Sequence, residues 1–481
     1  MFSFSNNLTV KPSGNLAALV LTIFASLLFF GCGGGGYNGG SPTVVTTYYT
    51  VIFLDENDVE IANLSKEMGS NITIPEAPEK KGYLFDGWIE VAGAQMIGKD
   101  ETSYIVTGDV TFKAQYIEVF RVAFFDEKLD LLKEENIIRG DSVDLDNKTL
   151  EYAKSWHLSH NTSVASGNFT PEGNINFYAT SDVIEILNET KLDDIGDNLS
   201  GKYILTSDIK LQVGENGVSE TQGWTPVGSS PDPFKGILNG DGHTISNFWI
   251  NRVSSYPVGL FGYVSGGTIK NVGILIDENR SVRGGNYVGG IAGELMGNST
   301  ITNSYVKGNV TGGAEVGGIV GYIGNSTINN SYFIGNVRGS TNVGAIAGHV
   351  RNNSTIEGSY SAGKVGTSSY IGAIAGIVDG GSTITNNAAI NQELNATSHF
   401  NRIVGYVSGT YTVSNNFALE TMSVNGAPKN SDDTDGLDGA DKTNDELKTQ
   451  TTYEDDLGWD FATIWKIDEG EGYPYLYWED R

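Results

Sequence analysis

The sequence predicts an all-β protein whose main part is a right-handed parallel β-helix, a solenoid, preceded by two small repeat domains. One observation is a recurring phrase, typified by VGGIVGYIGNSTINNSY, whose short runs show strand alternation and no helical apolar spacing. Its copies begin 27 to 30 residues apart, at Val258, Val288, Val316, Val343 and Ile371, with a degraded copy near Phe400. Such a period indicates a solenoid, because a propeller blade needs about 40–50 residues. The composition agrees, since 63 glycines and only 11 prolines suit many tight turns.

The bulk composition narrows the classes of partner. The chain has 481 residues, 39% of them hydrophobic, and a formal net charge of −28. The hydrophobic fraction is sufficient for packed domains rather than a disordered chain. The negative charge argues against a nucleic-acid partner, because phosphates are bound by Lys and Arg.

The N-terminal segment predicts export. An apolar run from Leu16 to Phe30 follows a short polar start with one cation, Lys11, and is of the length of a secretory signal peptide. The run ends in Gly31-Cys32, and Cys32 is the sole cysteine. This junction resembles the lipobox of bacterial lipoproteins, which implies a signal peptide over 1–31 and lipidation of Cys32. An ordinary signal peptide or membrane anchor is the alternative.

A Gly-rich stretch over 32–47 follows, and its composition predicts a flexible tether. In Gram-negative lipoproteins an Asp directly after the lipidated Cys favours the inner membrane. Gly33 stands at that place, so the resemblance implies a lipid-anchored, surface-exposed protein of the outer membrane.

The first repeat domain is expected over 48–118. It opens on a strand pattern, YYTVIFLDE, and ends on GDVTFKA, where Val110, Phe112 and Ala114 alternate with polar residues. Between them stand Pro75, Pro78 and the knot GYLFDGW. These residues resemble the Listeria–Bacteroides repeat, also called the internalin B-repeat, which implies a small β-grasp-like fold found in bacterial surface proteins. A second, degenerate copy is predicted over 119–182, with Trp156 in the place of Trp88.

The array over 183–427 is predicted to stack one coil per repeat at about 4.8 Å. Residues at equivalent positions of successive repeats are then neighbours in adjacent coils. We expect an apolar column of isoleucines, and two residues later, on the same strand face, an asparagine column with side chains that hydrogen-bond to each other. The structural ladder comprises Ile269, Ile301, Ile328, Ile356, Ile384, Asn271, Asn303, Asn330 and Asn386. The phrases resemble the GLUG motif of bacterial surface proteins, including immunoglobulin-A-specific metallopeptidases and large adhesins.

Two segments follow the array. The segment 428–447 is acidic and predicts a solvated linker. With Gly436 at the sixth place of an EF-hand loop, Ser431 and Lys442 would occupy places one and twelve, so it does not match that calcium motif, and a loose site is the alternative. The segment 448–481 is rich in Trp and Tyr and is predicted to cap the open end of the solenoid.

The sequence favours a non-enzymatic, adhesin-like or envelope-structural protein that presents a rod to an extracellular protein or glycan. It lacks His-Glu-x-x-His and Gly-x-Ser-x-Gly, and we assign no catalytic residue, metal ligand or cofactor. The alternative is a polysaccharide lyase or hydrolase on a β-helix scaffold. That activity needs acidic and basic residues converging on one sheet, whereas charged residues of the array such as Arg338 and Lys364 are sparse and are not expected to form a column.

Overall fold

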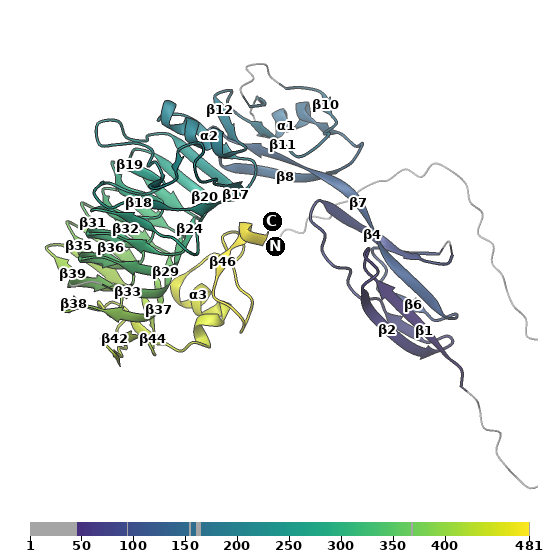
Figure 1. Ribbon diagram of the computed structural model, residues 1–481. Coiled ribbons are helices and arrows are strands. Elements are labelled where there is room, and N and C mark those ends of the chain that lie inside the picture. Colours follow the sequence, from purple (N-terminus) through teal and green to yellow (C-terminus); the bar gives the residue numbers. More distant parts are fainter. Residues whose placement is uncertain (1–45, 94, 153–154, 160–164, 367–368, 481) are drawn as a thin grey trace, which may run out of the picture.

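The computed structural model describes residues 46–93, 95–152, 155–159, 165–366 and 369–480. The predicted signal peptide, the predicted lipidation site Cys32 and nearly all of the tether lie outside these residues. Figure 1 shows two small β domains, a parallel β-solenoid and a C-terminal segment that runs back beside the coils. No helix in the described part of the chain has the length and apolarity to cross a membrane.

The first domain is a mixed sheet with the strand order β2-β1-β7-β4-β5, in which β1 and β7 pair in parallel. Its core is an aromatic triad: Phe53 contacts Trp88 edge-to-face at 5.0 Å and stacks on Phe112 at 5.5 Å. The strands are β1 (Tyr48–Leu54), β2 (Glu60–Glu67), β3 (Asn71–Thr73), β4 (Tyr83–Glu90), β5 (Met96–Gly98), β6 (Ser103–Ile105) and β7 (Val110–Phe125).

The second domain repeats this core. Phe124 contacts Trp156 edge-to-face at 4.9 Å and stacks on Phe177 at 5.4 Å. Its elements are β8 (Leu131–Ile138), β9 (Val143–Asp144), α1 (Leu145–Tyr152), β10 (Asn168–Phe169) and β11 (Ile175–Tyr178). The helix α1 has no counterpart in the first domain and was not expected from the sequence.

The two domains share one strand. The 16-residue β7 pairs with β1 and β4 through its first half, and with β8 and β11 through its second half. The predicted boundary between 118 and 119 therefore falls inside a continuous strand. Apolar and polar residues alternate through both halves without a turn residue, so the sequence pattern does not indicate that a strand ends there.

The second domain packs on the first coils of the solenoid. Asn239 Nδ2 donates to the carbonyl of Leu129 at 2.9 Å, and Arg121 forms an ion pair with Asp241 at 2.9 Å. A buried apolar cluster spans the contact, formed by Ala123, Phe125, Leu129, Tyr178, Val183 and Ile204. The largest sheet of the solenoid begins at β12 (Val183–Ile186).

The opening coils carry one short helix and a long strand. Their elements are β12 (Val183–Ile186), α2 (Glu189–Asp193), β13 (Lys202–Leu205), β14 (Ile209–Lys210), β15 (Val218–Ser219), β16 (Gly223–Trp224), β17 (Ile237–Phe248) and β18 (Ile250–Arg252).

The following coils pair in parallel in the predicted register. The successive phrase starts are direct strand partners, from Val258 with Val288 through to Ile371 with Phe400. One repeat is therefore one coil, and the parallel solenoid predicted from the period is confirmed.

Each coil contributes to several sheets. A six-stranded sheet comprises β19 (Phe261–Ser265), β22 (Ala292–Met296), β27 (Val320–Gly324), β31 (Ala347–Arg351), β35 (Ala375–Asp379) and β39 (Val404–Ser408). A four-stranded sheet comprises β26 (Ala314–Gly317), β30 (Thr341–Gly344), β34 (Ser369–Gly372) and β38 (Ser398–Phe400). The 23-stranded sheet begins with the seven strands β12 to β18 of the opening coils. It continues with β20 (Thr268–Ile276), β21 (Val282–Gly284), β23 (Thr300–Thr302), β24 (Tyr305–Lys307), β25 (Val310–Thr311), β28 (Thr327–Asn329), β29 (Tyr332–Arg338), β32 (Thr355–Glu357), β33 (Tyr360–Gly366), β36 (Ser382–Thr385), β37 (Ala388–Asn395), β40 (Tyr411–Ser414), β41 (Phe417–Leu419), β42 (Ser423–Val424), β43 (Ala427–Pro428) and β44 (Ala440–Lys442).

One glycine column is required by close approach between coils. Gly308, Gly335 and Gly363 have φ values of +130°, +155° and +111°. A Cβ at Gly335 would lie 1.8 Å from the carbonyl oxygen of Gly308, and one at Gly363 would lie 1.9 Å from that of Gly335. These strands can bend and stack at this column only without side chains.

The acidic segment is not the solvated linker that its composition predicts. The amides of Ile403 and Val404 donate to the carbonyl of Leu437, and β44 pairs in parallel with β41. The segment therefore forms the last rungs of the solenoid. Two of its carboxylates have cationic partners there: Asp441 pairs with the fully buried Arg402, and Asp438 pairs with Lys429.

The aromatic C-terminal segment lies along the side of the coils instead of capping their end. It comprises a 3₁₀ turn (Glu446–Lys448), α3 (Gln450–Leu457), β45 (Trp465–Lys466), β46 (Tyr475–Leu476) and a final 3₁₀ turn (Tyr477–Asp480). Trp459 Nε1 donates to the carbonyl of Asn386 at 2.9 Å, and Trp478 Nε1 to that of Asn303 at 3.0 Å. These contacts join the segment to coils far apart along the array (Figure 1).

Candidate functional site

The structure places the predicted isoleucines in one column. Ile269, Ile301, Ile328, Ile356 and Ile384 are consecutive strand partners, and each is fully buried. They fill the interior of the solenoid with β-branched side chains.

The predicted asparagines lie elsewhere than expected. Asn271, Asn303, Asn330 and Asn386 have φ values between +48° and +58° and are half-buried, so they occupy a corner rather than the interior strand face. Asparagine is among the residues that best tolerate this left-handed conformation. Because the corner reverses the alternation, the spacing of two residues no longer places them beside the isoleucines.

The side-chain ladder expected at these asparagines is incomplete. Asn271 Nδ2 donates to Asn239 Oδ1 at 3.0 Å, and Asn415 Nδ2 to Asn386 Oδ1 at 2.8 Å. Where Gly358 takes the corner, Asn386 Nδ2 instead donates to Glu357 Oε1 at 3.1 Å. The corner therefore shapes the backbone more than it forms a continuous amide ladder.

The continuous polar ladder is formed by the next residue, which is fully buried. The amide of Ser304 donates to Ser331 Oγ at 3.2 Å, that of Ser331 to Ser359 Oγ at 3.1 Å, and that of Ser359 to Asn387 Oδ1 at 3.0 Å. A second ladder runs through Ser299, Ser326, Ser354 and Ser382. Sequence reasoning missed both, although these serines recur at a fixed offset in each phrase.

This ladder gives a measurable expectation for Ser331→Ala. The substitution leaves the buried amide of Ser304 without its acceptor, so we expect the free energy of unfolding to fall by about 1–3 kcal/mol. Chemical denaturation measures this, with the exposed Ser340→Ala as the control. A loss no larger than that of the control would show that the ladder contributes nothing to stability.

A tyrosine stack lies beneath the C-terminal segment. Tyr305, Tyr332 and Tyr360 stack at 4.9 Å and 4.8 Å between centroids, and Trp478 stacks on Tyr305 at 5.4 Å. Glu479 accepts from the Tyr332 hydroxyl at 2.8 Å. The chain therefore covers part of this side of the coils with its own C-terminal segment.

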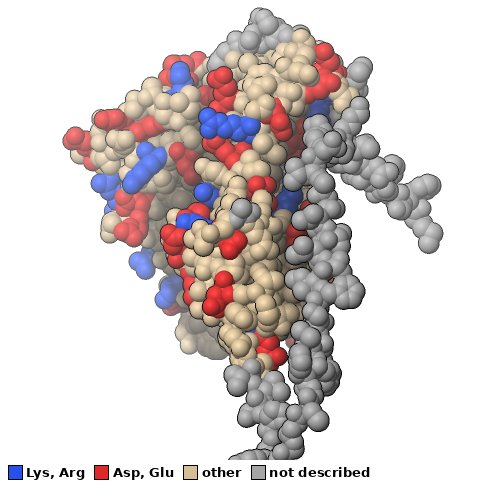
Figure 2. Space-filling model, turned by 90° about the vertical axis from the view of Figure 1, so that its right-hand side faces the viewer, with Lys and Arg blue, Asp and Glu red and all other residues tan. Residues whose placement is uncertain are grey.

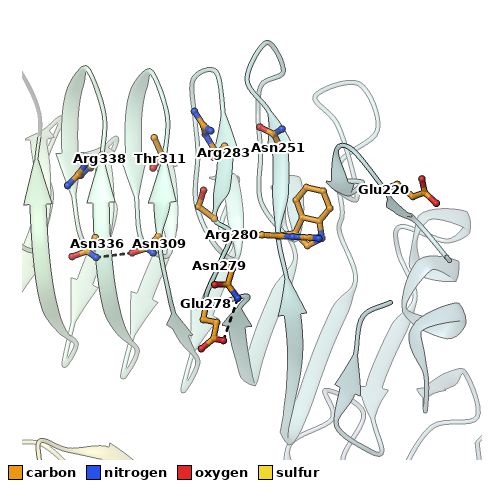
Figure 3. A pocket seen from close by; sticks show the side chains of 12 residues that line it. Glu220, Asn251, Glu278, Asn279, Arg280, Arg283, Asn309, Thr311, Asn336 and Arg338 are labelled. Atoms are coloured by element: carbon orange, nitrogen blue, oxygen red, sulfur yellow. Dashed lines mark hydrogen bonds between the residues drawn. The ribbon is translucent and has the colours of Figure 1, made fainter. Parts of the chain in front are cut away.

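A groove of about 630 Å³ lies on an uncovered side, across successive coils. Its first row consists of Asn251, Arg283, Thr311 and Arg338, which are direct strand partners from one coil to the next. The second row includes Asn309 and Asn336, whose side chains hydrogen-bond at 2.9 Å (Figure 3). The remaining lining residues are Glu220, Trp249, Glu278, Asn279, Arg280 and Ser281.

The expectation that the charged residues of the array form no column is wrong for Arg338. Arg283 and Arg338 share a column with one intervening rung, occupied by Thr311. The sequence contains the signal, because the separations between these residues equal the repeat intervals.

The arginines of the groove differ from the other arginines of the chain. Of the nine in the sequence, eight lie in the described residues. Four form ion pairs with carboxylates, namely Arg121, Arg139, Arg351 and Arg402. Arg252 donates to neutral oxygens such as the carbonyl of Trp224. The other three, Arg280, Arg283 and Arg338, are exposed, line the groove and have no ion pair within the described part of the chain.

Arg280 is held over an aromatic ring. Its guanidinium lies 4.2 Å from the ring centroid of Trp249, which is only 6% exposed. Such a contact orders a long side chain and keeps its N–H groups available for a ligand.

A row of aromatic side chains lies near the outer side of the six-stranded sheet. Tyr287 contacts Tyr322 edge-to-face at 5.7 Å, and Tyr322 contacts His349 in the same way at 5.3 Å. Farther along, Tyr406 is 39% exposed. These rings form a second surface of aromatic and polar character.

A larger cleft, of about 1160 Å³, lies where the second domain, the first coils and the C-terminal segment meet. It contains the acidic and basic residues that an active site would need, but its carboxylates contact other groups of the chain. The pairs are Asp241 with Arg121, Glu134 with Arg121, Glu185 with the Tyr178 hydroxyl, Asp208 with the Thr244 amide, and Glu479 with the Tyr332 hydroxyl.

His243 in this cleft has a lowered pKa. Burial is the main cause, and it outweighs Asp208, whose carboxylate lies 3.6 Å from Nδ1 and acts in the opposite direction. The neutral imidazole is therefore favoured. Among the described residues, no three His, Cys, Asp or Glu side chains are grouped so that they could hold a metal ion.

Acidic side chains are dispersed over the face of the molecule that Figure 2 shows. On the face shown in Figure 2, Asp and Glu lie between neutral residues, with fewer Lys and Arg among them. A groove with three arginines without carboxylate partners is thus unusual for a chain of net charge −28.

Comparison with known proteins identifies two sequence families and several relatives. Halomucin of Haloquadratum walsbyi is 33% identical over 286 residues, which are 56% of this chain and 3% of halomucin. A provisionally named Gly-rich membrane protein of Evansella cellulosilytica is 30% identical over 129 residues, which are 21% of this chain and 15% of that protein. The chain thus spans only a small part of these relatives.

Two solved structures are similar in part. One is a protein of Bacteroides ovatus, provisionally described as an immunoglobulin A1 protease, with 25% identity and a TM-score of 0.49 over 61% of this chain and 92% of that one. An IgA1 protease matches with 16% identity and a TM-score of 0.36 over 75% of this chain and 28% of that one. The family models match residues 49–115 and 284–311, so the chain contains a Listeria-Bacteroides repeat domain followed by the GLUG motif.

Proposed function

We propose that this chain is a non-enzymatic cell-surface protein whose solenoid binds a glycan. The observation that carries the proposal is the groove of arginine and asparagine side chains, which is built from successive coils and whose arginines form no ion pair with a carboxylate of the described residues. Polar side chains repeated along one axis suit a ligand that is itself a repeating chain. The names of the relatives, a mucin-like protein and a membrane protein, support a place at the cell surface.

Binding is better supported than catalysis. Glycoside hydrolases need a pair of carboxyl groups directed at the substrate, and lyases need a general base placed to take a proton from it. In the junction cleft the carboxylates are engaged with partners of their own, and burial favours the neutral form of His243. The alternative is a polysaccharide lyase or hydrolase on the β-helix scaffold. The two similar structures are named immunoglobulin A1 proteases, but the His-Glu-x-x-His of a metallopeptidase is missing from the sequence.

A glycan array tests the proposal directly. We expect the full-length protein to retain at least one class of polysaccharide and to release no reducing ends or unsaturated uronides from it. Retention would be measured by biolayer interferometry, and release by absorbance and reducing-sugar assays. Release that persists in purified protein would establish the enzyme instead.

Display at the surface is part of the proposal and depends on Cys32. We expect Cys32→Ala to move the protein from the membrane fraction to the soluble fraction of the cell envelope, because the lipid anchor is lost. Fractionation with labelled palmitate measures this. Cleavage of the wild-type protein by protease added to intact cells would confirm surface exposure, and labelling that persists in Cys32→Ala would refute the assigned site.

A further inference from the structure

We infer that the groove binds an anionic polysaccharide whose acidic groups recur along the chain, an inference that rests on the proposed function. The first argument for this inference is the charge of the groove. Arg280, Arg283 and Arg338 are exposed and lie in one groove, while no carboxylate of the described residues pairs with them. In a chain of net charge −28, carboxylates are available almost everywhere for pairing. Two carboxylates, Glu220 and Glu278, also line the groove, but neither forms an ion pair with these arginines. Guanidinium groups without an ion pair suit carboxylate or sulfate groups of a ligand, which they bind through paired hydrogen bonds.

The second argument is the strand register that spaces the arginines. Arg283 and Arg338 lie two rungs apart on one column, so their strands are about 10 Å apart at the usual spacing between strands. Figure 3 shows the two side chains on the same row, with Thr311 between them. A polysaccharide of acidic disaccharide units, lying along the solenoid axis, would bring one acidic group to each arginine.

The neighbouring residues suit the neutral parts of such a ligand. Asn309 and Asn336 form a row beside the arginine column, and their amides can donate to and accept from sugar hydroxyls. Arg280 is already ordered over Trp249, so less side-chain freedom is lost when an acidic group binds there. The groove therefore provides charged contacts at intervals and neutral contacts between them.

The test compares soluble polymers of defined charge. Full-length protein would be immobilised and exposed to polygalacturonate, dextran sulfate, neutral dextran and polyglutamate. We expect polygalacturonate or dextran sulfate to bind more tightly than dextran and polyglutamate, with affinity that falls as salt is added. We expect Arg283→Gln and Arg338→Gln each to weaken this binding about tenfold, since each removes a charged hydrogen bond. Tighter binding of polygalacturonate would indicate that the arginines prefer carboxylate groups, and tighter binding of dextran sulfate that they prefer sulfate groups.

Controls separate this inference from the proposed function. Arg139→Gln removes the same charge from an exposed position in the second domain, and we expect it to bind like wild type. Circular dichroism and thermal unfolding would establish that all variants are folded. Equal binding of dextran, equal binding of polyglutamate, or wild-type affinity in the double variant would each overturn the inference while leaving glycan binding in place. Failure of the wild-type protein to bind any glycan would overturn both.

Discussion

Replacing Arg402 by alanine is expected to lower the free energy of unfolding by about 3–5 kcal/mol, because the substitution breaks a buried charge cluster from one side. Arg402 is fully buried. Its Nε donates to the carbonyl of Asp438 at 3.1 Å and one terminal nitrogen to that of Gly439 at 2.8 Å. The other terminal nitrogen lies 2.5 Å from the Asp441 carboxylate. Alanine leaves two carbonyls without their donor and the Asp441 carboxylate without its cation, with only the Ser431 amide still donating to it, beside a cavity of the size of the lost side chain.

The loss is expected to start in the last coil. Urea denaturation gives the change in stability, and limited proteolysis with N-terminal sequencing shows whether new cleavage falls within 430–442. Arg338→Ala is the matched control, because that arginine is exposed and unpaired among the described residues. If Arg402→Ala costs no more than this control, the acidic segment is held by its backbone pairing alone.

The residue Arg402 also shows what could be predicted from the sequence. It stands at the second residue after the phrase start, where the other phrases have a neutral residue (Leu260, Gly290, Gly318, Ala345 and Ala373), and such a change near an array end predicts an atypical terminal unit. The identity of its partners could not be predicted, because the spacing to Asp438 and Asp441 follows no repeat. Composition alone predicted that the acidic segment is a linker. In the structure it belongs to the solenoid and pairs there with a buried cation.

Periodic features were predictable and their exceptions were not. The phrase starts and the isoleucine column follow from recurrence, since residues one coil apart must be neighbours in a parallel solenoid. The asparagines were misplaced because one residue with positive φ shifts the alternation, and nothing in the residue type fixes where this occurs. The serine ladders were not predicted, because serine is also common in turns that form no ladder.

One feature of the groove could be predicted from the repeat, and another could not. Arg283, Thr311 and Arg338 follow the repeat intervals, so their column was accessible from the sequence. That these arginines lack carboxylate partners was not, because ion pairs depend on which loops and segments lie nearby. The C-terminal segment, for example, packs on the tyrosine stack, and none of its residues lines the groove.

Replacing Trp465 by alanine is expected to cost about 3–5 kcal/mol, the usual loss when a buried Trp is truncated. Trp465 is fully buried and stacks on Trp459 at 4.5 Å. It also lies 6.0 Å from Tyr360, so it joins the C-terminal segment to the tyrosine stack of the coils. Its removal should release the segment from the coils before the coils themselves unfold, because strand pairing within the solenoid does not involve Trp465.

Hydrogen exchange resolves this order of events. We expect faster exchange in residues 446–480 and in the strands that carry Tyr332 and Tyr360, with unchanged exchange in the six-stranded sheet. Tyr477→Ala is the control, because Tyr477 belongs to the same segment and is 39% exposed. Faster exchange throughout the array would instead mean that the segment and the solenoid unfold as one unit. In that case the C-terminal segment is needed for the coils to stay folded, and the arginine groove would be lost together with it.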